Sequence, residues 1–249
     1  DKEGMKSLIF QAEQVLHSWQ PTWSSFIEAT LREEALQKLS TLSDLIWIGD
    51  GGYPNAERQR ILCKRISNQK TSEKEQAPIK GLLISGNFLF DQPSKRDIRG
   101  ALESIGAQSD QLGDIWIQGD RGAQVLCTPE VSAVLDQSKG NIRDVSFICE
   151  EITTDQINFP AQRIPRVFNS VEASCRLDAI ASAGFGISRA KVLEKIKKGK
   201  LRLNWKPIKQ SHKELSIGDR LYLEDRGFVE ILSLNLTKRQ RWRVEIKRQ

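Results

Sequence analysis

The side chains that could do chemistry in this chain are mostly cations, and they gather near its carboxyl end. Between Ile187 and Lys213 there are ten Lys or Arg residues and a single acid, Glu194. An ordinary solvated surface mixes both signs of charge, so a run this one-sided favours the binding of a polyanion such as a phosphate backbone. The alternative to polyanion binding is a lysine-rich surface that only contacts solvent.

A helix is expected to position much of this charge. Ser188 is a good N-cap residue, and Gly199 stands where a glycine commonly follows the last helical turn. The residues expected to face a core are Val192, Leu193 and Ile196, and those expected to form one cationic row at i, i+4 and i+7 are Lys191, Lys195 and Lys198. Since the start of a helix carries partial positive charge, Arg189 and Lys191 are unfavourable there. A phosphate bound to the N–H groups of residues 188–190 would reverse that penalty.

Short elements are expected on both sides of this helix. Leu177, Ile180 and Ala181 have the spacing of a short helix that Gly184 and Gly186 would end. Leu201, Arg202 and Leu203 alternate as a strand does, and Asn204-Trp205 is expected to turn the chain into residues 206–208.

These segments together resemble the RNA-binding domain named after ribosomal protein S-four. Three motifs carry the resemblance: Ser174-x-Arg176-Leu177-Asp178, Gly184-Phe185-Gly186-Ile187-Ser188-Arg189 and Ile196-x-x-Gly199-x-Leu201-x-Leu203-Asn204. The later Gly218-Asp219 also matches. Similar domains place the second helix and the following hairpin against the backbone of structured RNA. Carried over by position, the resemblance implies RNA contacts at Arg176, Ser188, Arg189, Lys191, Lys195, Lys198, Lys200, Arg202, Asn204 and Lys206.

One residue departs from the pattern of that domain. Such domains often have Gly after the Asn, and here the residue is Trp205. Its indole is expected either to stack on an unpaired base, which would make it an RNA-binding residue, or to cap the apolar edge of the domain. A second basic cluster, at Lys238, Arg239, Arg241, Arg243, Lys247 and Arg248, either extends the RNA surface or is a solvated tail.

The layout of the whole chain is similar to the YlmH-like branch of this superfamily. The similarity includes Gly51-Gly52-Tyr53-Pro54 with Glu57-Arg58, and the segment Gly119 to Val125. The Trp-rich amino-terminal part looks most like the cyanobacterial and plastid members labelled photosystem II S-four domain proteins. The resemblance implies binding to ribosomal or transfer RNA, on a large ribosomal subunit carrying an obstructed nascent chain. No residue pattern supports the photosystem role that the label implies.

Composition sets wider bounds. The 249 residues carry a net charge of +6, which suits two or three domains with cores large enough to fold without disulfides. The positive charge belongs to one end: residues 170–249 hold 19 bases and 9 acids, and residues 1–169 hold 19 bases and 23 acids. Four scattered cysteines indicate reduced, buried thiols and a cytoplasmic location, or the chloroplast stroma in a plant. No apolar run is long enough for membrane insertion.

The expected architecture is α+β. It comprises a helical N-terminal region (1–69), a linker (70–78), a ferredoxin or RRM-like βαββαβ domain (79–157), a second linker (158–170) and an S-four-type domain of two helices and a β-hairpin (171–249).

The N-terminal region is expected to hold helices near residues 8–19, 31–42 and 55–66 and a short strand at 45–48. Glu57, Arg58 and Arg60 on the third helix form a charged cluster, and a second contact to RNA is its functional alternative. The middle domain lacks the base-stacking aromatics of RNA-recognition domains in the corresponding segment, Arg121 to Cys127, and is expected to be a spacer or to face a protein.

The sequence does not predict an enzyme, and it does not predict a bound metal or cofactor. The two histidines, His17 and His212, have no nucleophile with an orienting acid nearby in sequence, and no metal-ligand spacing occurs. Arg176-Leu177-Asp178 resembles the catalytic element of pseudouridine synthases, whose aspartate is the nucleophile, but here a helix continues through residues 179–182. We therefore expect Asp178 to support helix packing. The leading hypothesis is a non-catalytic protein that binds structured ribosomal or transfer RNA, and the alternative is an assembly or scaffold factor for a photosynthetic or other protein complex.

Overall fold

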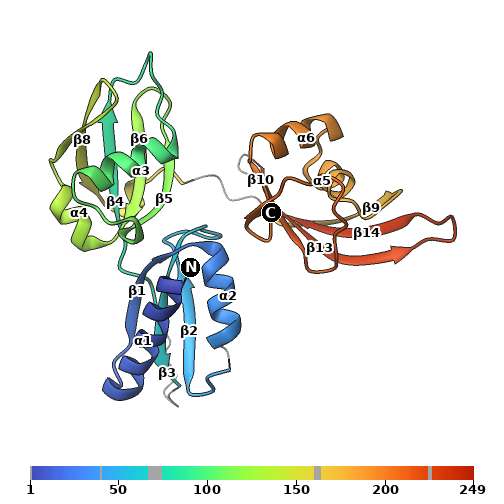
Figure 1. Ribbon diagram of the computed structural model, residues 1–249, viewed down its shortest axis with the longest axis horizontal. Coiled ribbons are helices and arrows are strands. Elements are labelled where there is room, and N and C mark those ends of the chain that lie inside the picture. Colours follow the sequence, from blue (N-terminus) through green and yellow to red (C-terminus); the bar gives the residue numbers. More distant parts are fainter. Residues whose placement is uncertain (1, 40, 67–74, 160–163, 224–225) are drawn as a thin grey trace. The chain divides into compact units, whose positions relative to one another are not determined.

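The computed structural model describes residues 2–39, 41–66, 75–159, 164–223 and 226–249. The protein is α+β with three antiparallel sheets, and the chain divides into two compact units, Asp1–Pro160 and Ala161–Gln249 (Figure 1). No helix in the described ranges is both long and apolar enough to cross a membrane. The four cysteines are free and buried, as expected.

The N-terminal region is built on a three-stranded sheet in the order β1-β3-β2. Its elements are α1 (Lys2–Ser18), β1 (Thr22–Ile27), α2 (Ala29–Leu39), β2 (Leu45–Asp50) and β3 (Gln59–Arg65). The expectation of a mainly helical region, with a third helix over 55–66, was therefore wrong. β3 is the central strand, and its consecutive residues Ile61, Leu62 and Cys63 are all buried. A strand that is buried on both faces does not alternate polar with apolar residues, so its sequence lacks the usual sign of a strand.

Two side chains of this region also differ from expectation. Trp19 lies just beyond α1, is 68% exposed and lies 3.7 Å beneath the guanidinium of Arg65. Arg60 is buried, and its Nε donates to the carbonyl of Ser24. It holds the region together and is not available as an RNA contact.

The middle part of the chain forms a five-stranded sheet in the order β5-β6-β4-β8-β7. Its elements are β4 (Lys80–Gly86), α3 (Lys95–Ser104), η1 (Ser109–Gln111), β5 (Leu112–Ile117), β6 (Gly122–Cys127), α4 (Pro129–Leu135), β7 (Lys139–Ile142), β8 (Val145–Ile152) and η2 (Thr154–Gln156). The expected β-α-β-β-α-β succession is present, and β7 is an additional edge strand that pairs with β8. Ser94 and Asp97 form a capping box at the start of α3.

The N-terminal region and the middle sheet share apolar side chains within the first compact unit. Phe26 of β1 is buried in one cluster with Leu126 of β6 and Ile152 of β8. Of the linker expected at 70–78, residues 70–74 lie outside the described residues. Ala77 is held in place, because its N–H donates to the Asp50 carboxylate across 2.8 Å.

The C-terminal unit is a six-stranded sheet in the order β11-β10-β12-β13-β14-β9, with two helices on one face (Figure 1). Its elements are β9 (Arg166–Glu172), α5 (Leu177–Phe185), α6 (Arg189–Lys197), β10 (Leu201–Leu203), β11 (Lys206–Pro207), β12 (Arg220–Leu223), β13 (Gly227–Leu236) and β14 (Trp242–Arg248). The linker expected at 158–170 was too long, since residues 166–170 belong to β9 and pair with β14. A strand at the edge of a sheet, with polar and apolar residues mixed, resembles a connection in sequence.

Two details of α5 and α6 correct the expected pattern. Gly184 does not end α5 but lies inside it, where a Cβ would come within 2.8 Å of Val229; Gly186, with a φ of +64°, is the C-cap. Leu193 does not face the core, being 40% exposed, whereas Val192 and Ile196 are buried as expected.

Candidate nucleic-acid interface

The start of α6 is built as the sequence predicts. The Ser188 hydroxyl caps the helix by accepting a hydrogen bond from the N–H of Lys191 at 3.3 Å. Gly199 adopts a φ of +67°, which is the left-handed conformation that ends a helix. With Val192 and Ile196 packed inward, the cations of α6 are carried on its outer side.

The cations of α6 have different environments. Lys191 is exposed, and Lys198 is exposed but pairs with Glu194 at 2.6 Å. Lys195 is half-buried. Arg189 lies with its Nη2 3.8 Å from Oε2 of Glu172 on β9, an ion pair that joins the start of α6 to the last residue of an edge strand. The contact to Glu172 could not be read from the sequence, because 17 positions separate the two residues and no local pattern links them.

The hairpin after α6 also forms as expected. Asn204 and Trp205 are the two residues between the paired ends of β10 and β11, and both have positive φ, +47° and +67°. Asn tolerates this conformation better than most residues do. Its carboxamide donates to Asp219 at 2.8 Å and accepts from the N–H of Arg220 at 2.9 Å, so the Asn204 side chain secures the hairpin to β12.

The sheet separates the hairpin residues into two groups. Leu201 and Leu203 face the helices, so Arg202 points to the opposite face, where it lies 5.9 Å from the ring centre of its neighbour Tyr222. Lys206 is exposed and lies opposite Leu203, on the face that the helices cover. Lys200 joins α6 to β10, and its N–H donates to the Lys195 carbonyl. Arg202 and Lys206 therefore lie on opposite faces near the β10–β11 edge of the sheet, whereas Arg189 contacts Glu172 on β9, the other edge strand.

Trp205 is held by the protein itself. Its side chain is 7% exposed, and its ring lies 5.2 Å from that of Tyr222 and 4.9 Å from that of Phe228. Of the two interpretations of this residue, the burial favours capping of the apolar edge over stacking on an unpaired base.

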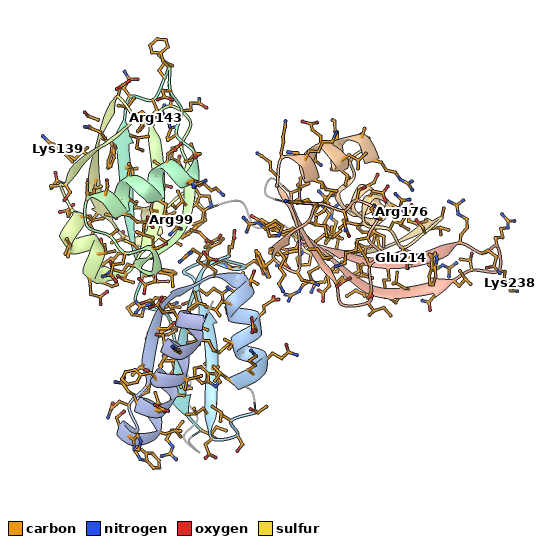
Figure 2. All side chains as sticks on the ribbon, viewed as in Figure 1. Arg99, Lys139, Arg143, Arg176, Glu214 and Lys238 are labelled. Atoms are coloured by element: carbon orange, nitrogen blue, oxygen red, sulfur yellow. The ribbon has the colours of Figure 1, made fainter. Side chains whose placement is uncertain are left out.

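Arg176 precedes α5 and turns toward Asp178. Its Nε and Nη2 donate to the Asp178 carboxylate at 3.1 and 3.3 Å, and its backbone pairs with Glu214 in a short bridge. Figure 2 labels Arg176 and Glu214. Asp178 is 8% exposed, so it lies beneath the surface with its charge balanced by Arg176. This arrangement supports the packing role expected for Asp178, and Arg176 keeps an exposed side-chain fraction of 46%.

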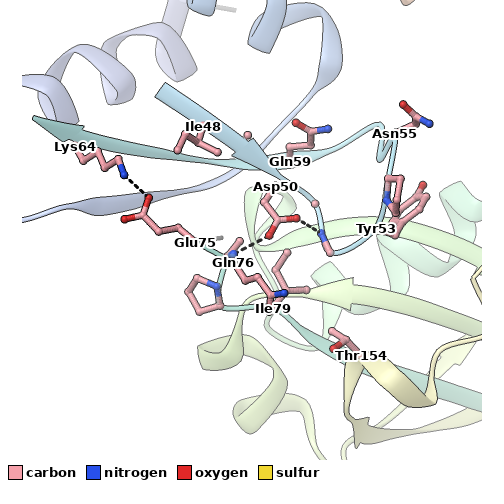
Figure 3. A pocket seen from close by; sticks show the side chains of 16 residues that line it. Ile48, Asp50, Tyr53, Asn55, Gln59, Lys64, Glu75, Gln76, Ile79 and Thr154 are labelled. Carbon is pink, nitrogen blue, oxygen red and sulfur yellow. Dashed lines mark hydrogen bonds and ion pairs between the residues drawn. The ribbon is translucent and has the colours of Figure 1, made fainter. Parts of the chain in front are cut away.

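The first compact unit contains a separate pocket of about 770 Å³ near the Gly51-Gly52-Tyr53-Pro54 segment (Figure 3). Its charged groups are paired with one another or with the backbone. Lys64 contacts Glu75 at 2.8 Å, and the Asp50 carboxylate accepts from the N–H groups of Gly52 and Ala77. These contacts hold residues 75–77 against the end of β2, so the charged residues that line the pocket stabilise the fold.

Comparison with known proteins finds two matching family models and one curated relative. Residues 175–221 match the family model of the S4 domain, which is the S-four domain of the sequence analysis, and residues 1–67 match the model "YlmH, N-terminal". The chain is 24% identical over 200 residues to the "Ribosome-associated protein quality control protein P2" of Bacillus subtilis (strain 168), covering 80% of this chain and 76% of that protein. A solved structure, "Cell division protein ylmH from Streptococcus pneumoniae", aligns with a TM-score of 0.48 and 19% identity over 63% of this chain and 92% of that one. The chain thus carries a YlmH N-terminal region and an S4 domain, and it is homologous to the Bacillus protein.

Proposed function

We propose that this is a YlmH-family protein that binds structured RNA, ribosomal or transfer RNA in a ribosome-associated setting, through α6 and the β10–β11 hairpin, and catalyses no reaction. The observation that carries the proposal is the arrangement of α6. Val192 and Ile196 are buried in the core, while Arg189, Lys191 and Lys198 are exposed on a helix whose start is capped by a serine.

Electrostatics explains why such a helix suits a phosphate backbone. The first turn of α6 contains no acid, although acids are favoured there by the helix dipole. In the free protein Lys191 is unfavourable beside this end of the dipole, and Arg189 is offset only by Glu172 at 3.8 Å. A bound phosphate would turn each of these repulsions into an attraction, so the same residues that weaken the free helix would strengthen the complex.

The ribosome-associated setting of the proposed function is inferred from the Bacillus subtilis relative. Its name describes a ribosome-associated protein, and the present chain aligns with most of its length. The proposed partner is therefore RNA on or near the large ribosomal subunit, which would be met in the cytoplasm. The photosystem role carried by the sequence resemblance is not part of this proposal.

Salt dependence of binding tests the proposal. Binding of the full chain to ribosomal RNA should weaken with salt, with a log–log slope of about 0.7 to 0.9 for each phosphate contacted. Replacing Arg189, Lys191 and Lys195 with Ala should flatten that slope by about two to three. The matched control replaces three exposed cations of the first unit, Arg96, Arg121 and Lys139, which changes net charge equally. Equal slopes for the two triple variants would contradict the assignment.

A sedimentation experiment tests the ribosomal setting. The protein should migrate with ribosomal particles, and ribonuclease treatment should release it. Co-migration that survives digestion, or retention with a membrane fraction, would favour a protein or membrane partner.

One observation favours a second candidate function, that of an assembly factor whose middle domain contacts another protein. Phe90 is 96% exposed and Leu89 is 56% exposed in the loop between β4 and α3. That loop is fixed, because Arg143 in the β7–β8 turn pairs with Asp91 and contacts Asp97 at 3.1 Å. An apolar side chain presented on a rigid loop is typical of a protein-binding anchor. A photo-crosslinking residue at position 90 should then capture a protein, and capture of RNA alone would reject this candidate.

A further inference from the structure

The hairpin that joins β13 to β14 at the far end of the C-terminal sheet is hydrogen-bonded up to its turn. β13 and β14 remain paired as far as Leu236 and Trp242, and the intervening turn is closed by its own hydrogen bonds. The Thr237 N–H donates to the Arg241 carbonyl at 2.7 Å, and the Arg241 N–H donates to the Thr237 hydroxyl at 3.1 Å. We call residues 237–241 the arm tip. Figure 2 shows Lys238 at the end of this projection.

The arm tip is strongly and one-sidedly charged. Lys238, Arg239 and Arg241 are all exposed, and Arg243 follows on β14. Within the described ranges, none of these four cations has an acid within ion-pairing distance, and Arg241 reaches only the carbonyl of Val171, at 3.5 Å. Three neighbouring cations without an acid repel one another, and the fold gains nothing from placing them together.

The arm tip is connected to the start of α6 through β9. Trp242, where the arm tip joins β14, is paired across the sheet with Glu172. Glu172 in turn contacts Arg189 at the start of α6. The acid that pairs across the sheet with the residue after the arm tip is thus already engaged by a cation of α6, and cations of α6 and of the arm tip belong to one compact unit.

Resting on the proposed function, we propose that the arm tip is a second RNA contact, and that the ligand of this unit is double-helical RNA, whose backbone can meet α6 and the arm tip at the same time. Two fixed and separated cationic groups are complementary to a ligand whose phosphates are fixed in space. A single strand would have to be ordered before it could meet both groups, and that ordering costs free energy. An RNA helix is already ordered and is recognised mainly by its shape and backbone.

The test compares two RNA probes, a stem-loop with a stem of about 16 base pairs, the length that a duplex-binding domain commonly spans, and an unpaired strand of equal length. The arm variant carries Lys238→Ala, Arg239→Ala and Arg241→Ala. These side chains are exposed, so the variant should fold, and an unchanged melting curve verifies it. For the stem-loop, the arm variant should lower the salt slope by about two. For the single strand, the slope should change by less than one.

The controls separate this inference from the proposed function. The Arg96, Arg121 and Lys139 variant has the same loss of charge and should bind the stem-loop as the wild type does. If the α6 variant flattens the slope and the arm variant does not, the arm contact is rejected and the proposed function stands. If the wild type binds the single strand as tightly as the stem, the duplex preference is rejected. If neither probe is bound, both proposals fail. A charge-reversed arm, with Glu at the three positions, should abolish stem binding if the contact exists.

Discussion

The phenol of Tyr53 donates a hydrogen bond to the carboxylate of Asp114 across 2.7 Å. The same carboxylate accepts from the N–H groups of Glu57, at 2.8 Å, and Arg58, at 3.1 Å. One aspartate on β5 therefore holds the whole loop between β2 and β3. The Tyr53 ring also packs against Trp116, with 5.1 Å between ring centres. These contacts explain why residues from the N-terminal sheet and the middle sheet form a single compact unit.

Replacing Asp114 with Ala should destabilise that unit by about 2 to 4 kcal/mol, because three donors lose their acceptor at a part-buried site. Urea unfolding followed by tryptophan fluorescence measures the change, with Asp110→Ala as the control. Asp110 is exposed nearby, so its removal should alter the free energy of unfolding by less than about 0.5 kcal/mol. Identical midpoints for the two variants would show that the hydrogen bonds at Asp114 contribute nothing net.

Two helical glycines should respond in opposite directions to Ala. A Cβ at Gly100 in α3 would meet nothing within 4 Å, so Gly100→Ala should stabilise the first unit by about 0.5 to 1 kcal/mol through the better helix propensity of Ala. A Cβ at Gly184 in α5 would lie 2.8 Å from a methyl group of Val229, and overpacking there should cost about 1 to 3 kcal/mol. Thermal unfolding of each unit measures both changes. Adding Val229→Ala should recover part of the second loss, and its failure to do so would argue against the clash.

Trp205 should be a stability residue. Trp205→Ala should destabilise the C-terminal unit by about 3 kcal/mol, since it empties the space against Tyr222 and Phe228. Trp205→Leu keeps much of the apolar volume but removes the aromatic face, so it should leave the RNA dissociation constant within about twofold, where loss of base stacking would cost about 1 to 3 kcal/mol. Trp19→Ala is the stability control, because Trp19 is 68% exposed. A large loss of RNA affinity in a well-folded Trp205→Leu protein would restore the stacking interpretation.

The buried thiols predict a dependence on alkaline pH. Burial raises the pKa of Cys63 and of Cys149 from 9.0 to about 11, and that of Cys127 to about 12. Between about pH 9 and pH 11 the unfolded chain releases these protons and the folded chain keeps them, so this contribution to stability is full below pH 9 and is lost as the pH rises. The free energy of unfolding should therefore fall between pH 9 and 10. A variant with Ala at all three positions should show a shallower fall. At pH 8 a thiol reagent should react rapidly only after unfolding.

Local signals explain what the sequence could predict. The N-cap at Ser188, the glycine at position 199 and the alternation of Leu201 with Leu203 each act within a few residues, so α6 and the hairpin were predicted correctly. The central strand β3 was not, because its central position depends on pairing with β1 and β2 and its Ile61 and Cys63 are buried by side chains of helices far away in the sequence. Strand β9 was missed for a related reason, since only its pairing with β14 distinguishes it from a linker.

The candidate site was predictable as a list of cations but not as a surface. Sequence spacing cannot tell that Arg202 and Lys206 point to opposite faces of the sheet, nor that Trp205 is buried by Tyr222 and Phe228 from β12 and β13. The arm tip was visible only as charge near the end of the chain. Its projection beside β9 follows from strand pairing across about 70 residues of sequence.

The unfavourable start of α6 has a consequence for its motions. With Arg189 and Lys191 beside its positive end and no acid in its first turn, the first amides of this helix should exchange with deuterium faster in free protein than those of α5, whose first turn contains Asp178. Once an anionic ligand occupies that end, the ranking should invert. The amides of residues 190–192 would then report occupancy of the site directly, in the intact protein and without any label.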